Sequence, residues 1–306
     1  MPPRSPLPLR HGLSAAWVCT PHRDPRVPAP WTSMGDWLRD HVDARVDVAG
    51  LLGGERFVYA DGAVVGDADP YRPHTFVWFH RDLRDEPEVP GPLTVLHRDD
   101  RVVVVDKPAF LSTVPRGRHV TQSVVVRLRA ELDLPELTPM HRLDRVTSGL
   151  LVCATERRWR SSYQAMFADG AVRKTYRALA PWRAELATPT TVANHVRAIP
   201  RTGRAEVVAG APVNAETLVE LEERRGEVAV YRLTPRTGRT HQLRLHLLGL
   251  GAPIVDDPLY PVDLEVDVDD FRRPLQLLAS GLEYADPVDG GPRRFVSPRR
   301  LPLEAE

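Results

Sequence analysis

The hydrophobic pattern of the chain after residue 90 predicts both strands and helices. Two short apolar runs, "RVVVVD" at 101–106 and "GLLVCA" at 149–154, have the length of fully buried strands. Two longer stretches, "TQSVVVRLRAEL" at 121–132 and "TERRWRSSYQAMFADG" at 155–170, have helical spacing. In the second of these, aromatic residues recur every fourth position, which places them on one helix face.

Polar residues predict where the helices begin and end. We expect Thr155 to cap the helix at 155–170 and Gly170 to end it. The stretch "RTGRTHQLRLHLLGLG", at 236–251, predicts a glycine-containing turn followed by a helix that Thr240 caps.

The remaining apolar segments alternate as strands do. "AVRKTYRALA" at 171–180 predicts one strand, and 216–235 predicts a β-hairpin with Gly226 in its turn. "LQLLASGLEY" and "RRFVSP" near the C-terminus predict two more. Hairpin strands mixed with helices indicate an α+β fold with a mixed, largely antiparallel central sheet flanked by helices.

A smaller unit precedes this domain. "WTSMGDWLRDHV" has helical spacing, "RFVYADGAVVG" has a hairpin signal at Asp61-Gly62, and "HTFVWFH" predicts a strand. A Pro-rich break at 84–93 predicts a linker. We therefore expect an extended or disordered arm at 1–30, a small N-terminal unit with its linker at 31–90, and a main domain at 91–306.

Composition narrows the class of protein. The chain has 306 residues, of which 42% are hydrophobic and 27% charged, as in soluble globular proteins. No apolar run has the length of a membrane span, and Pro, Arg and His interrupt the N-terminal region where a signal peptide would need an apolar core. Cys19 and Cys153 lie too far apart for a zinc motif, and two cysteines make no disulfide scaffold. We expect a cytoplasmic, monomeric protein.

Charge is unevenly distributed although the net charge is zero. Residues 141–177 hold eight Lys or Arg and three Asp or Glu, and residues 228–255 hold four Arg and no acid. Such segregation can create one basic face that attracts phosphate, or it can be solvated charge on several faces. Only Lys107 and Lys174 are lysine among 41 basic residues, so a compact ammonium is expected to matter at these two positions.

The stretch "HRLDRVTSG" at 141–149 places one carboxylate, Asp144, between two arginines and ahead of a buried strand. Taken alone, Asp144 is either a solvated turn acid or a carboxylate held ionised for chemistry. "HRDL" at 80–83 matches part of a kinase catalytic loop, but Pro87 stands where that loop needs Asn and no Gly-rich phosphate loop precedes it.

Four motifs in order resemble the RluA-like family of RNA pseudouridine synthases. They are "DKPAFLSTVPRG", "HRLDRVTSGLLV", "RKTYRAL" and "RTGRTHQLRLHLLGLGAPIVDDPLY", within residues 93–290. The resemblance implies a uridine isomerase that needs no cofactor and no metal, and whose partner is structured RNA, either tRNA or 23S-type rRNA. The N-terminal unit is faintly similar to the small ribosomal-protein-type RNA-binding domain that often precedes this catalytic domain.

The resemblance also implies roles for individual residues. Asp144 matches the essential aspartate, which acts as a nucleophile or as a base, and Arg244 matches the arginine that pairs with it. Tyr176 matches the tyrosine that stacks on the target uracil, and Arg142 the arginine that fills the gap left by the flipped base.

Other residues are expected to contact RNA or support the loop. These are His141, Lys107, Lys174, Arg239 and His241. The chain departs from the family where Asp256 replaces a frequent glycine and Leu278 a frequent histidine, which leaves local RNA contacts open.

Overall fold

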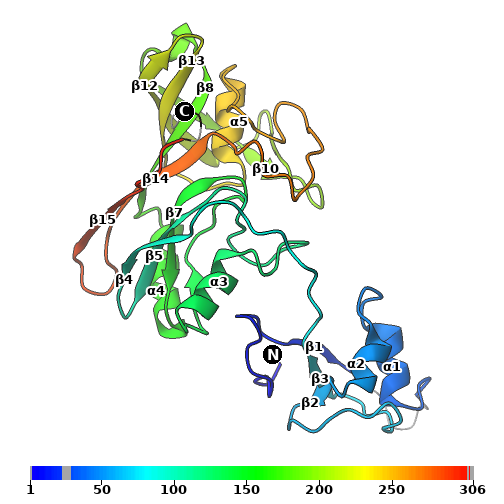
Figure 1. Cartoon of the computed structure of the whole chain (residues 1–306). Helices are drawn as coiled ribbons and strands as arrows, with labels where there is room; N and C mark the ends of the chain where they lie inside the picture. Colours follow the sequence, from blue (N-terminus) through cyan, green and yellow to red (C-terminus); the bar gives the residue numbers. More distant parts are fainter. Residues whose placement is uncertain (1, 23–28, 302, 304–306) are drawn as a thin grey trace. The chain divides into compact units, whose positions relative to one another are not determined.

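In the computed structural model, which describes residues 2–22, 29–301 and 303, the chain divides into two units. The first is Met1–Asp85 and the second Glu86–Glu306. The division falls inside the Pro-rich stretch 84–93, where Pro residues remove backbone donors and disfavour regular structure. Each unit is described separately below (Figure 1).

The first unit is a small sheet packed against two helices. Its strands lie in the order β1–β3–β2, all antiparallel. The elements are β1 (Ala16–Cys19), α1 (Met34–His41), α2 (Val48–Gly53), β2 (Val58–Tyr59) and β3 (Phe76–Phe79). Ser33 and Asp36 form a capping box at the start of α1, which positions Trp37 and Leu38 in the core.

Within the arm expected at 1–30 to be extended or disordered, residues 16–19 are extended and form strand β1. The segment "AWVC" alternates between the two sheet faces and pairs along its whole length with β3, so its backbone groups are satisfied in the sheet. Residues 23–28 of the expected arm lie outside the described residues.

The second unit is built on one large mixed sheet, as predicted. In the part of the chain that the structure describes, its main path is β4–β5–β7–β14–β8–β13–β12–β9, with β15 on β14 and β6 on β7. Strands β7 and β14 pair in parallel, and the other described neighbours in this sheet are antiparallel. The α+β prediction is confirmed.

The element bounds follow chain order. They are β4 (Thr94–Arg98), β5 (Val102–Lys107), α3 (Val124–Glu131), β6 (Thr138–Pro139), β7 (Ser148–Ala154), η1 (Arg157–Trp159), α4 (Arg160–Ala168), β8 (Arg173–Pro181), η2 (Ala184–Leu186), β9 (Thr190–Asn194), β10 (Val196–Ala198), β11 (Ala205–Val207), β12 (Ala215–Arg225), β13 (Val228–Pro235), α5 (Gln242–Gly249), β14 (Leu277–Ala285) and β15 (Pro292–Val296).

Helices cover both faces of this sheet, which explains why its central strands are continuously apolar. On one face, Val103 and Val105 of β5 pack in the same core as residues of α3 and α5. On the other face, Val102 and Val104 pack with Tyr163 of α4. Strands β5 and β7 are buried throughout, because both sets of alternating side chains meet a covered face.

Two predicted helix caps are wrong. The Thr155 hydroxyl donates to the Asp100 carbonyl at 2.6 Å, and a 3₁₀ turn precedes α4, which begins at Arg160. Thr240 does not cap α5 either: His241 occupies the N-cap position in the left-handed region, with φ 56° and no side-chain cap. In each case tertiary contacts override the local preference.

Gly149 is required at the start of β7. Its φ is 112°, and a Cβ there would lie 2.3 Å from the Ala279 carbonyl oxygen of the neighbouring strand β14. The parallel pairing of β7 and β14 therefore depends on the absence of a side chain immediately after the turn that carries Asp144.

We predict that Gly149→Ala lowers the free energy of unfolding by about 3 kcal/mol, because strain at this φ adds to a clash with rigid backbone. Urea denaturation measures it. Gly226→Ala is the matched control, since Gly226 also has positive φ but a Cβ there meets nothing within 4 Å. Equal losses in the two variants would contradict the argument from close approach.

Candidate active site

Hydrogen bonds to backbone groups hold the loop that carries Asp144 in place. The Thr113 hydroxyl donates to the Leu143 carbonyl at 2.8 Å and accepts from the Leu143 N–H at 3.2 Å. The Thr147 N–H donates to the Asp144 carbonyl at 3.0 Å, which closes the turn. The flanking Leu143 and Val146 are buried, whereas the Asp144 side chain remains 35% exposed. A fixed backbone thus presents a carboxylate that a substrate can reach.

Lys107, which was expected to contact RNA, is buried and supports the backbone around this loop. Its ammonium is buried and donates to the carbonyls of Pro108, Leu111 and Arg145 at 3.0, 2.8 and 3.2 Å. Burial lowers the pKa of Lys107 to about 7, while the negative charge of Asp144 opposes that shift. Three carbonyl acceptors match the three donors of an ammonium, which explains why lysine and not arginine stands here.

Arg244 links Asp144 to a second acid, Asp257. Its Nε and one terminal nitrogen donate to the two Asp257 carboxylate oxygens at 2.7 and 2.5 Å. Its other terminal nitrogen lies 3.5 Å from Asp144 Oδ2. The Arg244 and Asp257 side chains are each 1% exposed. One guanidinium is therefore held by a buried bidentate pair and directs its remaining edge at the half-exposed Asp144.

The charge on Arg244 is secured by this arrangement. Burial opposes the charged form, but the Asp257 hydrogen bonds and the charges of Asp257 and Asp144 raise the Arg244 pKa overall. Asp257 is itself satisfied, because Oδ1 also accepts from the backbone N–H groups of Leu259 and Tyr260 at 2.9 and 3.1 Å. A permanent positive charge therefore stands beside the Asp144 carboxylate.

His241 lies against Asp144 and is not a free phosphate contact. Its side chain is 7% exposed, with Nε2 3.8 Å from Asp144 Oδ2 and Nδ1 2.9 Å from the Tyr260 hydroxyl. That hydroxyl accepts from the Ala205 N–H at 2.8 Å and lies 2.9 Å from the Ala205 carbonyl oxygen. Burial lowers the His241 pKa, and the charge of Asp144 opposes the shift.

Tyr176 lies within electrostatic range of the same carboxylate. Burial, and then the negative charge of Asp144, raise the pKa of the Tyr176 phenol, so it is protonated at neutral pH. In the sheet, Tyr176 of β8 is opposite Ala279 of β14, which is opposite Gly149 of β7. In the sheet, β14 therefore lies between the strand of Tyr176 and β7, the strand that follows Asp144.

A buried hydrogen-bond network holds the turn that leads into α5. The Gln242 amide donates to the Glu216 carbonyl at 3.0 Å and to the Thr217 hydroxyl at 2.9 Å. The Thr217 hydroxyl lies 2.9 Å from His246 Nδ1, and His246 Nε2 lies 3.1 Å from Asn194 Oδ1. These contacts suit a neutral imidazole that accepts at Nδ1 and donates at Nε2.

This network predicts a loss of stability in acid. Burial lowers the His246 pKa from 6.5 to about 4. Between these values the unfolded chain binds a proton that the folded chain does not, so folding is weakened as pH falls from 6.5 to 4, by about 3 kcal/mol in full. Urea denaturation of wild type and His246→Gln from pH 7 to pH 4 measures the difference. Parallel pH profiles for the two proteins would refute this assignment.

The other expected RNA contacts divide into partly buried and exposed residues. His141 is structural: its Nε2 accepts from the Val152 N–H at 3.2 Å, its ring stacks on Phe167 at 4.4 Å, and burial lowers its pKa to about 3. Lys174 is half-buried, and burial lowers its pKa. Arg142 and Arg239 are exposed, and Arg239 Nε donates to the Asn214 carbonyl at 3.1 Å.

The sequence did not identify Asp257 and Tyr260 as site residues. Both stand in "IVDDPLY", where two adjacent acids give no indication of which one pairs with Arg244. The structure separates them: Asp257 points to Arg244, whereas Asp256 pairs with Arg273, with 2.8 Å between Asp256 Oδ1 and Arg273 Nε.

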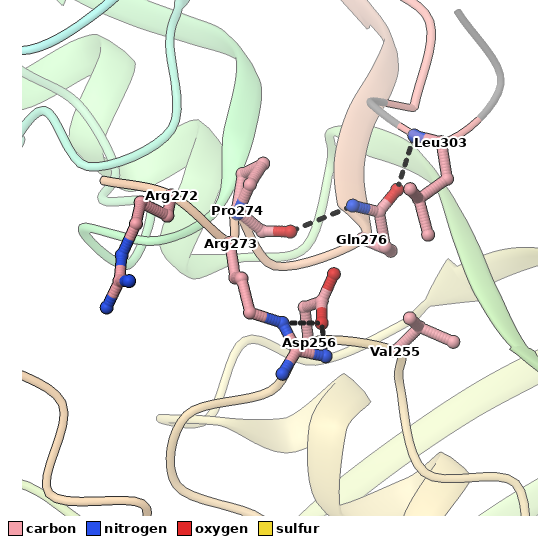
Figure 2. A pocket seen from close by; sticks show the side chains of 7 residues that line it. All are labelled: Val255, Asp256, Arg272, Arg273, Pro274, Gln276 and Leu303. Carbon is pink, nitrogen blue, oxygen red and sulfur yellow. Dashed lines mark hydrogen bonds and ion pairs between the residues drawn. The ribbon is translucent and has the colours of Figure 1, made fainter. Parts of the chain in front are cut away.

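A cavity of about 510 Å³ lies beside this segment but outside the cluster around Asp144. Figure 2 shows its lining, which is Val255, Asp256, Arg272, Arg273, Pro274, Gln276 and Leu303. Its polar groups already have protein partners: Arg273 binds Asp256, Arg272 binds Asp270, and the Gln276 amide binds the Pro274 carbonyl and the Leu303 N–H. The charged side chains among the described lining residues are therefore all paired within the protein.

Together, Asp144, Arg244, His241 and Tyr176 form a site suited to carboxylate chemistry. An exposed acid stands beside a buried guanidinium, an imidazole and a protonated phenol. Within residues 2–22, 29–301 and 303, no three His, Cys, Asp or Glu side chains are grouped as a metal site. None of the helices there has both the length and the apolar character needed to cross a membrane.

Sequence comparisons give consistent matches. The family model described as RNA pseudouridylate synthase matches residues 101–248. An uncharacterized RNA pseudouridine synthase of Synechocystis sp. is 31% identical over 66% of this chain and 70% of its own length. The dual-specificity RNA pseudouridine synthase RluA of Vibrio parahaemolyticus is 30% identical over 69% of this chain and 85% of its own. Human pseudouridylate synthase RPUSD2 is 36% identical over 58% of this chain, which spans only 32% of that longer protein.

A solved structure matches the fold. The structure of human RNA pseudouridylate synthase domain containing 1 is similar with a TM-score of 0.56 at 25% identity, covering 69% of this chain and 86% of that chain.

Proposed function

The chain belongs to the RluA-like family of RNA pseudouridine synthases, and from that premise we propose that it isomerises uridines of structured tRNA or rRNA to pseudouridine through Asp144. The observation that carries the proposal is the contact of 3.5 Å between Arg244 and the half-exposed Asp144, with Arg244 held by Asp257. A carboxylate beside a buried guanidinium and partly open to solvent can act on a sugar that enters from solvent.

The reaction needs a short set of steps. The bond from N1 of uracil to the sugar breaks, the base rotates, a bond from C5 to the sugar forms, and the proton on C5 is lost while N1 gains one. Asp144 acts on the sugar, either as a nucleophile at C1′ or as a base at C2′. A primary isotope effect with uridine deuterated at C2′ identifies the base route, and its absence the nucleophile route.

Other residues near Asp144 or on its loop have positions that suit base stacking, base flipping and phosphate binding. Tyr176 presents a protonated phenol near Asp144, where its ring can stack on the flipped uracil. Arg142 is exposed on the same loop and can occupy the space that the base leaves. Arg239 is exposed at the turn before α5 and can contact phosphate. We propose the same role for Lys174, which is half-buried on β8.

Nucleoside analysis tests the proposal and narrows its substrate. Unmodified tRNA and large-subunit rRNA made by transcription are incubated separately with the protein, digested to nucleosides and separated by chromatography. We expect an isomer of uridine, equal in mass and resistant to glycosidic cleavage, from one of the pools. Its absence from both pools, with the protein folded and the RNA bound, would contradict the proposed activity.

A further inference from the structure

The outer face of the sheet in the N-terminal unit carries a row of aromatic rings. Residues directly opposite in antiparallel strands share a face, so the pairs Trp17–Trp78 and Cys19–Phe76 lie on one side of β1 and β3. The alternate residues of these strands, such as Val77 and Phe79, pack into the core with the helices. The outer face is therefore the side of the sheet away from α1 and α2.

The rings are contiguous. Trp17 lies 5.5 Å from Phe76 and 6.4 Å from Trp78, between ring centroids. Phe76 lies 6.3 Å from His74, which lies 5.4 Å from His22. We call these five residues the aromatic row. Trp78 is buried, but Trp17 is 46% exposed, and His74 and His22 are also exposed.

The exposed part of Trp17 does not contribute to packing within the unit. A tryptophan usually contributes to stability by burial, and nearly half of Trp17 is left in solvent. Single exposed apolar residues are ordinary on protein surfaces, but contiguous exposed aromatic groups mark binding surfaces. The row therefore has the character of a recognition surface.

The charge around the row favours a polyanion. Residues 2–22, which include β1, contain Arg4, Arg10, His11 and His22 and no acid. Arg10 and His11 lie within electrostatic range of His80, the residue after β3, and His80 Nε2 is 3.1 Å from the Pro8 carbonyl. The acids at 36–55 lie on or beside α1 and α2, and those at 61–69 follow β2. Asp82, which lies within electrostatic range of Arg10, is paired with Arg56 at 2.6 Å.

We propose that the aromatic row is a stacking platform for unpaired nucleotides of RNA, with Trp17 as its central residue. The inference rests on the proposed function, which supplies an RNA substrate, and it assigns the N-terminal unit a part in binding that substrate. Aromatic rings stack on any base, and flanking cations attract the phosphates that join them, so the platform would recognise single-stranded RNA of varied sequence. A protein partner would instead favour an apolar patch with a polar rim.

The test compares Trp17→Leu with wild type in equilibrium binding to a uridine-rich single-stranded 12-mer RNA and to a duplex of equal length. Leucine keeps an apolar side chain on the strand but removes the stacking ring. We expect Trp17→Leu to bind the single strand about 5- to 150-fold more weakly, to bind the duplex within about twofold of wild type, and Trp17→Phe to recover most of the affinity. Val288→Ala in the second unit is the control, since Val288 is also 46% exposed.

Two outcomes would overturn the inference. Unchanged affinity of Trp17→Leu for the single strand would show that the row serves something other than RNA, such as a protein partner. Equal weakening for both RNAs, together with a lower melting temperature, would show that Trp17 only stabilises the sheet. Failure of the proposed function is seen separately: a wild type that forms no pseudouridine while Trp17→Leu still loses single-strand affinity would leave the platform in place without the isomerase.

Discussion

Asp144→Asn is expected to abolish isomerisation while leaving RNA binding intact. Asparagine has nearly the same shape, and the backbone bonds to Thr113 and from Thr147 do not involve the carboxylate, so the loop keeps its position. The amide has neither the negative charge nor the nucleophilicity of the acid. We expect the single-turnover rate to fall by about 10⁴-fold, the scale of removing a reacting group.

The measurement is the rate of pseudouridine formation with enzyme in excess over RNA, alongside binding to the same RNA. Asp256→Asn is the matched control, because Asp256 is a nearby acid whose partner Arg273 is mostly exposed. An Asp144→Asn rate within tenfold of wild type would place the essential acid elsewhere.

Asp257→Asn is expected to produce the largest loss of stability. Asp257 and Arg244 are both buried, and removing one charge leaves the other without its bidentate partner inside the protein. We expect the free energy of unfolding to fall by about 3–5 kcal/mol. Activity should fall further than folding alone explains, because Arg244 would lose the contacts that direct it at Asp144.

Denaturant titration measures the stability of Asp257→Asn, and rates are compared at a temperature where it remains folded. Asp256→Asn again serves as control, with a smaller expected loss, since its partner Arg273 is 78% exposed and stays solvated when the Asp256 charge is removed. A loss for Asp257→Asn no greater than that of its neighbour would show that Arg244 has another source of compensation.

Much of the sheet was predictable because its signals are local. The runs "RVVVVD" and "GLLVCA" are apolar at every position, and the structure buries β5 and β7 on both faces. Gly226 ends up with φ 62° in the turn between β12 and β13, as a short hairpin turn requires. Periodicity and turn residues are sufficient for such features.

The caps of α4 and α5 were not predictable, because they depend on distant partners. Thr155 has the chemistry of a cap, but its hydroxyl is used by Asp100, 55 residues away in sequence. His241 adopts a left-handed conformation, and in it the side chain contacts Asp144 and the Tyr260 hydroxyl. No window of sequence contains these contacts.

The sequence motifs nominated residues of the candidate site, but not the ion pairs and hydrogen bonds between them. The motifs nominated Asp144, Arg244 and Tyr176, and the structure places Arg244 and Tyr176 within electrostatic range of Asp144. Which of the adjacent acids Asp256 and Asp257 pairs with Arg244 depends on which side chain faces the interior, and packing decides that. Lys107 was expected to contact RNA, but its buried ammonium donates to three backbone carbonyls, which the sequence did not indicate.

The most direct test of the account is release of tritium from RNA labelled at C5 of uridine, with wild type and Asp144→Asn side by side. Isomerisation replaces the bond from C5 to hydrogen with a bond from C5 to the sugar, so each turnover frees one label. We predict release by wild type from tRNA or from large-subunit rRNA, and none above background by Asp144→Asn. Equal release by both proteins would contradict the assignment of Asp144, and release by neither from RNA that both bind would contradict the proposed reaction.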